Sequence, residues 1–262
     1  MTPFVKNNIP LPCGKCPACR SRRASAWSFR LMQEEKISSS AYFLTLTYDT
    51  NNVHITEKGR MGLNKRDLQL FFKRLRKRHP AERKIRYYAV GEYGSKTERP
   101  HYHVILFNSS IEHIQPSWQL GQVHYGTVEA ASVGYTLKYI SKVSKFPKYV
   151  GDDRAKEFSI MSKGLGKSYV SDKTILWHLD DHINRMYLNI PDGKKIAMPR
   201  YYKERIYNEE QREQIAMCAR LKAQEEFIIE FNSPDYQKKQ RDKDQAIKSL
   251  IELQSQPIKS KL

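Results

Sequence analysis

The sequence of 262 residues has few cysteines, few acidic residues and no long apolar segment. Four cysteines are too few for a disulfide framework in a chain of this length, and three of them lie within seven residues. A membrane-spanning helix needs an apolar run of about 18 residues, and the sequence contains none. It also shows no secretory signal. We therefore expect a cytoplasmic protein that does not associate with a membrane.

Acidic residues are strongly outnumbered by basic ones. The chain has 46 Lys and Arg against 28 Asp and Glu, which gives a formal net charge of +18. Residues 203–262 contain 12 basic and 11 acidic residues, so nearly all of the net charge belongs to the first 202 residues. Such a charge attracts phosphate chains of any sequence, and it also suits membrane surfaces and ribosomes. Composition alone therefore indicates a polyanionic partner without identifying it.

A basic helix is predicted over residues 64–78. Its apolar residues recur at the spacing of a core-facing stripe, namely Leu68, Phe71, Phe72 and Leu75. Asn64 is suited to be the N-cap, and the late cations suit the C-terminal end of the helix dipole. We expect phosphate contacts from Lys73, Arg74, Arg76 and Lys77. The alternative is a basic face that is only solvated.

Short apolar runs separated by turn residues predict strands at residues 42–49, 84–93, 101–107 and 122–128. Their order around the basic helix predicts an α+β fold with an antiparallel sheet. We divide the chain into a cysteine-rich basic segment (1–40), a main domain (41–202) and a charged helical region (203–262). A helix start is predicted at Asn208, and partial disorder is expected at the end of the chain.

The run His101-Tyr102-His103 lies in one of the predicted strands. Residues i and i+2 of a strand face the same way, about 7 Å apart, so both imidazoles can reach one divalent cation. Glu92, nine residues upstream, is expected on a neighbouring antiparallel strand. Two imidazoles and one carboxylate leave coordination positions open, as a catalytic metal requires. The alternative is a histidine pair without a metal.

A segment downstream repeats the spacing Tyr-x-x-Lys, at Tyr135 with Lys138 and at Tyr139 with Lys142. If the segment is helical, both phenols lie on one face about 6 Å apart along the axis, each with a lysine one turn away. A tyrosine hydroxyl can attack a phosphodiester polarised by a metal ion and become attached to DNA. Two tyrosines would permit two successive transfers. The alternative is an aromatic stripe against the core.

Two further segments contain candidate ligands. Cys13, Cys16 and Cys19 could hold a structural zinc ion, with a fourth ligand from Cys218 or a histidine, or could remain reduced thiols. The arginines that follow at once would then face DNA, namely Arg20, Arg22 and Arg23.

The other segment, residues 158–168, ends in Gly-Lys-Ser, but its glycines are only two residues apart, unlike those of a nucleotide-binding phosphate loop. We expect this segment to be a loop that contacts the DNA backbone through glycine amides and through Lys163 or Lys167. Because no nucleotide site is predicted, a separate helicase would have to open a duplex.

Taken together, five motifs in a fixed order resemble the HUH endonucleases, and specifically the two-tyrosine rolling-circle replication initiators of small single-stranded DNA phages, in particular those of gokushovirus-type microviruses. The motifs lie at residues 12–19, 44–49, 71–76, 91–94 with 99–103, and 199–202. The position between the two histidines is usually a bulky hydrophobic residue in that family, and here it is Tyr102.

The resemblance implies a ferredoxin-like or RRM-like sheet with the histidines on a central strand. It implies that Glu92, His101 and His103 bind Mn²⁺ or Mg²⁺ and that Tyr135 and Tyr139 are the nucleophiles. The implied activity is nicking and joining of single-stranded or supercoiled origin DNA in the host bacterial cytoplasm, with a host polymerase and helicase as partners. Alternatives are an HUH transposase or relaxase, and a non-catalytic DNA- or RNA-binding protein whose sheet aromatics stack bases.

Overall fold

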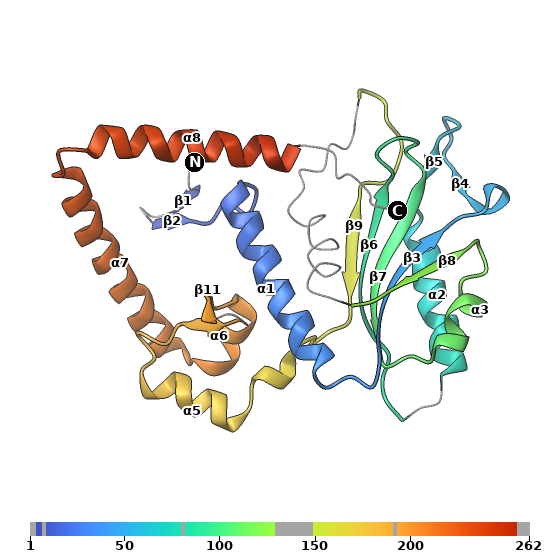
Figure 1. Ribbon diagram of the computed structural model, residues 1–262, viewed down its shortest axis with the longest axis horizontal. Helices are drawn as coiled ribbons and strands as arrows, with labels where there is room; N and C mark the ends of the chain where they lie inside the picture. The colour runs from blue at the N-terminus through green and yellow to red at the C-terminus, as the bar shows by residue number, and fades with distance from the viewer. Residues whose placement is uncertain (1–3, 7–8, 80–81, 129–148, 191–192, 256–262) are drawn as a thin grey trace. The chain divides into compact units, whose positions relative to one another are not determined.

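The computed structural model describes residues 4–6, 9–79, 82–128, 149–190 and 193–255 (Figure 1). The described residues form two compact units. The first, Arg30–Lys167, is called the sheet unit below, and the second, Met1–Phe29 with Ser168–Gln256, is called the helical unit. The segment with the predicted nucleophiles Tyr135 and Tyr139 and the lysines Lys138 and Lys142 lies outside the described residues.

The sheet unit is built on a five-stranded sheet in the order β8-β3-β7-β6-β9, and every neighbouring pair is antiparallel. The strands are β3 (Ala41–Thr47), β6 (Arg86–Tyr93), β7 (Pro100–Phe107), β8 (Val123–Gly126) and β9 (Phe158–Met161). The predicted α+β fold with an antiparallel sheet is therefore confirmed. Strand β9 falls where the sequence predicted a loop. Its four residues pair with β6 more than 60 positions upstream, and such a distant partner leaves no local pattern.

Helix α2 (Lys65–Arg78) packs on one face of this sheet, as its apolar stripe predicted. Asn64 caps the helix, because its side chain accepts a hydrogen bond from the backbone N–H of Arg66 at 2.9 Å. The stripe is fully buried in one apolar cluster with alternate residues of β7, namely Tyr102, Val104 and Leu106. This face of the sheet is called the helix face below.

Shorter elements complete the sheet unit. They are η1 (Thr50–Asn52), β4 (His54–Ile55), β5 (Met61–Gly62), η2 (Ile111–His113) and α3 (Ile114–Ser117). Trp118 follows α3, is buried in the core, and donates from its indole N–H to the carbonyl of Thr47 at 2.8 Å. That bond attaches the loop before β8 to the end of β3.

The helical unit begins with a short hairpin and a long helix that the sequence did not predict. Its elements are β1 (Phe4–Lys6), β2 (Ile9–Leu11), α1 (Pro17–Glu35), η3 (Lys167–Tyr169), α5 (Asp172–Asp180), β10 (Tyr187–Asn189), β11 (Lys195–Ala197), α6 (Arg200–Ile206), α7 (Glu209–Phe231) and α8 (Tyr236–Ser255). Its core joins distant parts of the chain, since Phe29 meets Tyr169 and Tyr202 edge to face at 5.1 and 5.9 Å between ring centroids. These contacts group residues 168–202 with the N-terminal segment, whereas the sequence placed them in the main domain. The three-part division stays a prediction.

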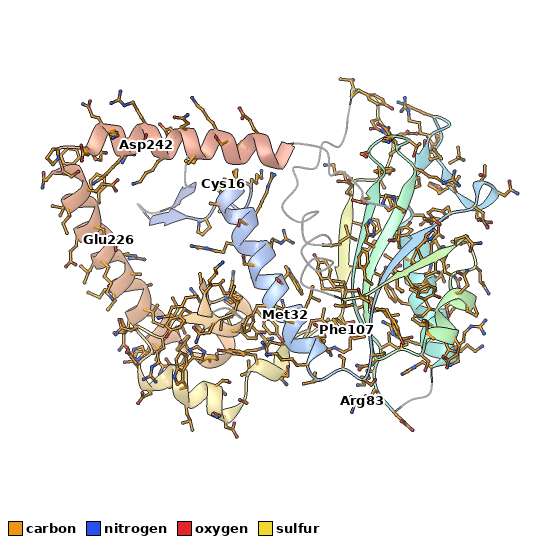
Figure 2. All side chains as sticks on the ribbon, in the orientation of Figure 1. Cys16, Met32, Arg83, Phe107, Glu226 and Asp242 are labelled. Carbon is orange, nitrogen blue, oxygen red and sulfur yellow. The ribbon has the colours of Figure 1, made fainter. Side chains whose placement is uncertain are left out.

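The C-terminal region is helical and mostly exposed, with side chains extending from α7 and α8 around Glu226 and Asp242 (Figure 2). The predicted helix start is confirmed, because Asn208 and Gln211 form a reciprocal capping box at the beginning of α7. Helix α8 extends to Ser255, where we expected partial disorder, and the ion pair of Lys243 with Glu230 at 2.5 Å connects α8 to α7. No helix in the described residues combines the length and apolar character that crossing a membrane requires.

Candidate metal centre

Strand register brings the predicted ligands together on the sheet face opposite α2, which is called the histidine face below. Glu92 of β6 lies directly across from His101 of β7, and Thr45 of β3 lies directly across from His103. Because side chains alternate along a strand, His101 and His103 leave the sheet on one side while Tyr102 enters the core on the other. The central position of β7 thus places both imidazoles between two neighbouring strands.

The three side chains converge on one oxygen. His101 Nε2 lies 2.7 Å and His103 Nε2 lies 3.0 Å from Glu92 Oε1. One ligand atom from each residue can be chosen so that all lie within 4.8 Å of one another. The second carboxylate oxygen of Glu92, Oε2, is buried and has no hydrogen-bond partner within the described part of the chain. A buried oxygen without a partner is costly unless a cation or a donor meets it.

The outer nitrogens of both rings are also held in place. His101 Nδ1 lies 3.2 Å from the carbonyl oxygen of Arg99, and His103 Nδ1 lies 3.0 Å from the hydroxyl of Thr45. The ring of Phe43 stacks on His103 with 5.5 Å between centroids. These contacts orient each Nε2 toward Glu92, as outer partners do for metal-binding histidines. Sequence reasoning missed Thr45 and Phe43. Their position in a strand next to the His-x-His strand was the available signal.

The electrostatics of the group follow from burial and mutual contact. Burial would raise the pKa of Glu92, but the hydrogen bonds from His101 and His103 outweigh it and lower the pKa below its ordinary value. Burial opposes the charged form of His101, yet Glu92 and the Arg99 carbonyl raise its pKa. For His103 burial prevails and lowers the pKa. An ionised Glu92, a protonated His101 and a neutral His103 result.

This donor set fits a divalent cation. It offers two imidazole nitrogens and a carboxylate whose second oxygen has no other partner among the described residues. Imidazole with carboxylate suits Mn²⁺ and related ions, and three protein ligands leave positions for substrate oxygens. His101 would have to release its Nε2 proton to bind such an ion.

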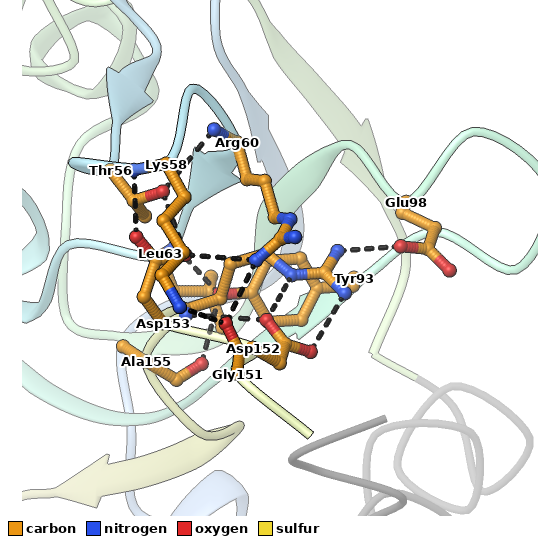
Figure 3. A network of polar contacts seen from close by, with 11 residues as sticks. Thr56, Lys58, Arg60, Leu63, Tyr93, Glu98, Gly151, Asp152, Asp153 and Ala155 are labelled. Atoms are coloured by element: carbon orange, nitrogen blue, oxygen red, sulfur yellow. Dashed lines mark hydrogen bonds and ion pairs between the residues drawn. The ribbon is translucent and has the colours of Figure 1, made fainter. Parts of the chain in front are cut away.

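A polar network holds the chain beside Glu92 (Figure 3). The hydroxyl of the adjacent residue, Tyr93, accepts from the backbone N–H of Leu63 at 3.0 Å and donates to the carbonyl of Ala155 at 2.8 Å. Arg154 lies over the Tyr93 ring, 5.2 Å from its centroid, and pairs with Asp152 and Glu98 at 2.9 and 2.5 Å. The network therefore joins the segment after the undescribed residues 129–148 to the end of β6 that carries Glu92.

The same network continues to the hairpin of β4 and β5. Asp153 accepts from the side chain of Thr56 at 3.0 Å and from the backbone N–H of Lys58 at 2.9 Å, and Arg60 donates to the carbonyl of Gly151 at 3.1 Å (Figure 3). Residues 151–155 are thus held at both the hairpin and the sheet.

The predicted DNA contacts of α2 lie on the helix face, away from the candidate metal centre. Lys73, Arg76 and Lys77 are exposed. Arg74 is half-buried, donates to the carbonyl of Ser117 at 2.8 Å, and has a pKa lowered by burial. Its contact with α3 accounts for Arg74 without DNA, whereas the other three remain predicted phosphate contacts.

The segment after β9 is only partly available for a DNA contact. The backbone N–H of Gly166 is buried and donates to Glu34 at 2.8 Å, so this glycine amide is engaged within the protein. The carbonyl of Leu165 likewise accepts from Arg30 at 3.0 Å. Lys163 and Lys167 are exposed and remain predicted phosphate contacts.

A second group of possible metal ligands lies in the helical unit. The sulfur atoms of Cys13, Cys16 and Cys19 lie within 4.8 Å of one another, and none of the described cysteines forms a disulfide. Cys218 is not part of this group within the described residues. The predicted DNA-contacting arginines follow in α1, where Arg22 and Arg23 are exposed and Arg20 is half-buried.

Comparison with known proteins agrees with this geometry. Residues 41–144 match the family model of the replication-associated protein ORF2. The chain is 28% identical to replication-associated protein VP4 of Bdellovibrio phage phiMH2K, over 75% of this chain and 67% of that protein.

This chain is a relative of phage replication-associated proteins. It is 25% identical to replication-associated protein ORF2 of Spiroplasma virus 4, over 97% of this chain and 87% of that protein. It is 26% identical to replication-associated protein ORF4 of Chlamydia phage 1, over 75% of this chain and 53% of that protein. No solved structure matches the chain. The resemblance predicted from the motifs is confirmed, and the matched residues 41–144 include the histidine face.

Proposed function

We propose that this phage-type replication protein nicks and rejoins single-stranded DNA at a replication origin, and so initiates and terminates rolling-circle replication of a phage genome in the bacterial cytoplasm. The observation that carries the proposal is the convergence of Glu92, His101 and His103 on the histidine face. The relatives are named for replication, which supports the same process. A divalent ion, Mn²⁺ or Mg²⁺, would supply charge stabilisation at the phosphodiester.

The protein's own residues divide the remaining work. The phenol oxygen of Tyr135 or Tyr139 attacks phosphorus, the bond from phosphorus to the 3′ oxygen breaks, and that oxygen takes up a proton. The products are a 5′-phosphotyrosine and a free 3′ hydroxyl for a host polymerase. Because a phenol has a pKa of about 10, the attack needs an adjacent cation, and the Tyr-x-x-Lys spacing offers Lys138 and Lys142.

Joining reverses the first step. A 3′ hydroxyl attacks the phosphotyrosine, a phosphodiester forms, and the phenol leaves. With two tyrosines, one can hold the first 5′ end while the other cuts again. We therefore expect Tyr135→Phe and Tyr139→Phe each to retain some single-turnover nicking and to lose release of a closed circle.

A nicking assay tests the proposal. Single-stranded oligonucleotides that tile the genome segment around this reading frame are incubated with the full chain and Mn²⁺ or Mg²⁺, and SDS-resistant adducts are counted. We expect adduct formation on one oligonucleotide, loss of the adduct with chelator, and Mn²⁺ support at least equal to that of Mg²⁺. Binding without any adduct on the whole tiled set would favour a non-catalytic nucleic-acid-binding protein.

A further inference from the structure

A cluster of three thiols stands apart from the histidine face and has no role in the proposed nicking reaction. Cys13, Cys16 and Cys19 are half-buried at the start of α1, and their sulfur atoms lie within 4.8 Å of one another. Three sulfurs on one tetrahedral zinc ion lie about 3.8 Å apart, because each bond is about 2.3 Å long. The cluster therefore needs only a small inward movement to hold an ion.

The backbone around the cluster is shaped as a turn that leads into a helix. Gly14 has a φ of +71°, in the left-handed region that favours glycine, and this turn brings Cys16 back toward Cys13. The backbone N–H of Cys16 donates to the sulfur of Cys13 at 3.2 Å. Arg20 donates its backbone N–H to the carbonyl of Cys16 at 3.0 Å, so the turn passes directly into α1.

Charge at the same place favours thiolates. The N-terminal end of a helix is positive, and the 19-residue helix α1 begins at Pro17, between two of the three cysteines. Lys15 is exposed in the turn, and α1 has no acidic residue in its first turn. An anionic metal-thiolate centre is therefore compensated locally.

We infer that Cys13, Cys16 and Cys19 form a zinc site that is separate from the candidate nicking centre. On binding, the three thiols release their protons to solvent and coordinate the ion as thiolates. No fourth cysteine, histidine or carboxylate joins the group within the described residues, so a water molecule or a donor outside them completes the tetrahedron. A soft, borderline ion such as Zn²⁺ is the class that a three-sulfur set selects.

The site would fix the beginning of α1. Arg22 and Arg23 are exposed within the next two turns of this helix. Metal binding would hold their helix against fraying, and they are predicted phosphate contacts. The inference does not depend on nicking, since a zinc site can serve a protein with or without that activity.

The direct test uses the unmodified full chain. The purified protein is alkylated with N-ethylmaleimide before and after a strong chelator, and the modified peptides are mapped by mass spectrometry. We expect the three clustered cysteines to be protected until zinc is removed and Cys218, outside the cluster, to react in both samples. Equal reaction of the cluster with and without chelator would overturn the site.

Metal content gives an independent test with matched variants. We expect about one tightly held zinc ion per chain in the wild type, in Cys218→Ser and in the double variant His101→Ala/His103→Ala, and close to none in Cys16→Ser. Zinc that survives Cys16→Ser but is lost from the histidine variant would place the ion on the histidine face and overturn the inference. If Cys16→Ser does not fold, the alkylation result on the wild type decides.

Discussion

On the helix face of the sheet, Tyr102 is fully buried and its hydroxyl lies 2.7 Å from that of Tyr48. On the histidine face, the residues immediately before and after it approach a carboxylate with an unpartnered oxygen among the described residues. The same three consecutive residues thus contribute a satisfied polar network to one face and an unsatisfied one to the other. The helix face is built for stability, whereas the histidine face keeps a site for a cation and a substrate.

The Tyr102 network explains why a tyrosine can stand between the two histidines. Its hydroxyl accepts from the backbone N–H of Asn64 at 3.0 Å and donates to the Asn64 carbonyl at 2.8 Å, and Tyr48 in turn donates to Asp67 at 2.8 Å. Burial raises the pKa of Tyr102 to about 12, so this phenol stays protonated. A hydroxyl at this position therefore secures the start of α2, and a bulky hydrophobic residue could not.

The largest effect is expected from the histidine face. The double variant His101→Ala/His103→Ala should lose nicking by about 10³-fold or more, because charge stabilisation by a metal ion amounts to several kcal/mol. Its affinity for single-stranded DNA and its melting temperature should change little. Single-turnover adduct formation measures the first quantity, with the exposed His54→Ala as the matched control. Nicking at the wild-type rate by the double variant would remove the histidines from the reaction.

The helix face should respond in the opposite way. Tyr102→Phe leaves the backbone N–H and carbonyl of Asn64 without their partner and should cost about 1–3 kcal/mol of unfolding free energy. The folded variant should still nick, because the ring keeps its packing and the histidines are unchanged. Urea unfolding against Tyr149→Phe, an exposed tyrosine, measures the cost. An unchanged unfolding midpoint combined with lost nicking would contradict this division between the faces.

Charge on the helix face should affect binding but not chemistry. Replacing Lys73, Arg76 and Lys77 by Ala should weaken single-strand binding and lower the slope of log affinity against log salt by about 2, if each contacts one phosphate. The adduct rate at saturating DNA should stay at the wild-type value, because these residues lie away from the candidate metal centre. A salt slope equal to that of the wild type would show that α2 does not contact DNA.

The smallest effect concerns pH and the helical unit. Buried His178 receives a hydrogen bond from Tyr169 at Nε2 and donates from Nδ1 to the carbonyl of Arg185, and burial lowers its pKa. Because the unfolded chain then binds the proton more readily, stability should be complete above about pH 6.5 and fall as the pH drops below it. His178→Gln should flatten the dependence of melting temperature on pH below about 6.5, and His54→Gln should not. A decline of equal steepness in both variants would exclude His178 as its source.

The parts of the fold that local patterns determine were predictable from the sequence. The stripe of α2, its cap at Asn64 and the central strands all follow from residue spacing. The spacing also predicted that Glu92 would meet the two histidines, because a short antiparallel connection places it directly across from His101. Its unpartnered oxygen and the contacts of Thr45 and Phe43 depend on strand register and could not be derived from spacing.

Other features depend on contacts between distant residues. Helix α1 has a mixed, arginine-rich sequence, and its core contact at Phe29 involves partners about 140 and 173 positions away along the chain. Strand β9 pairs only with β6, and Gly166 is engaged by Glu34 from α1. None of these partners is visible in a local window, so this part of the chain was predicted as a loop and as a segment of the main domain.

The central claim is that the histidine face activates DNA for attack by a tyrosine of residues 129–148. The most direct measurement is peptide mass spectrometry of the SDS-resistant adduct formed with Mn²⁺. We predict that the DNA is attached to Tyr135 or Tyr139, and that neither the double variant Tyr135→Phe/Tyr139→Phe nor His101→Ala/His103→Ala gives an adduct. An adduct of normal yield in either double variant, or one located on a tyrosine elsewhere in the chain, would contradict the account.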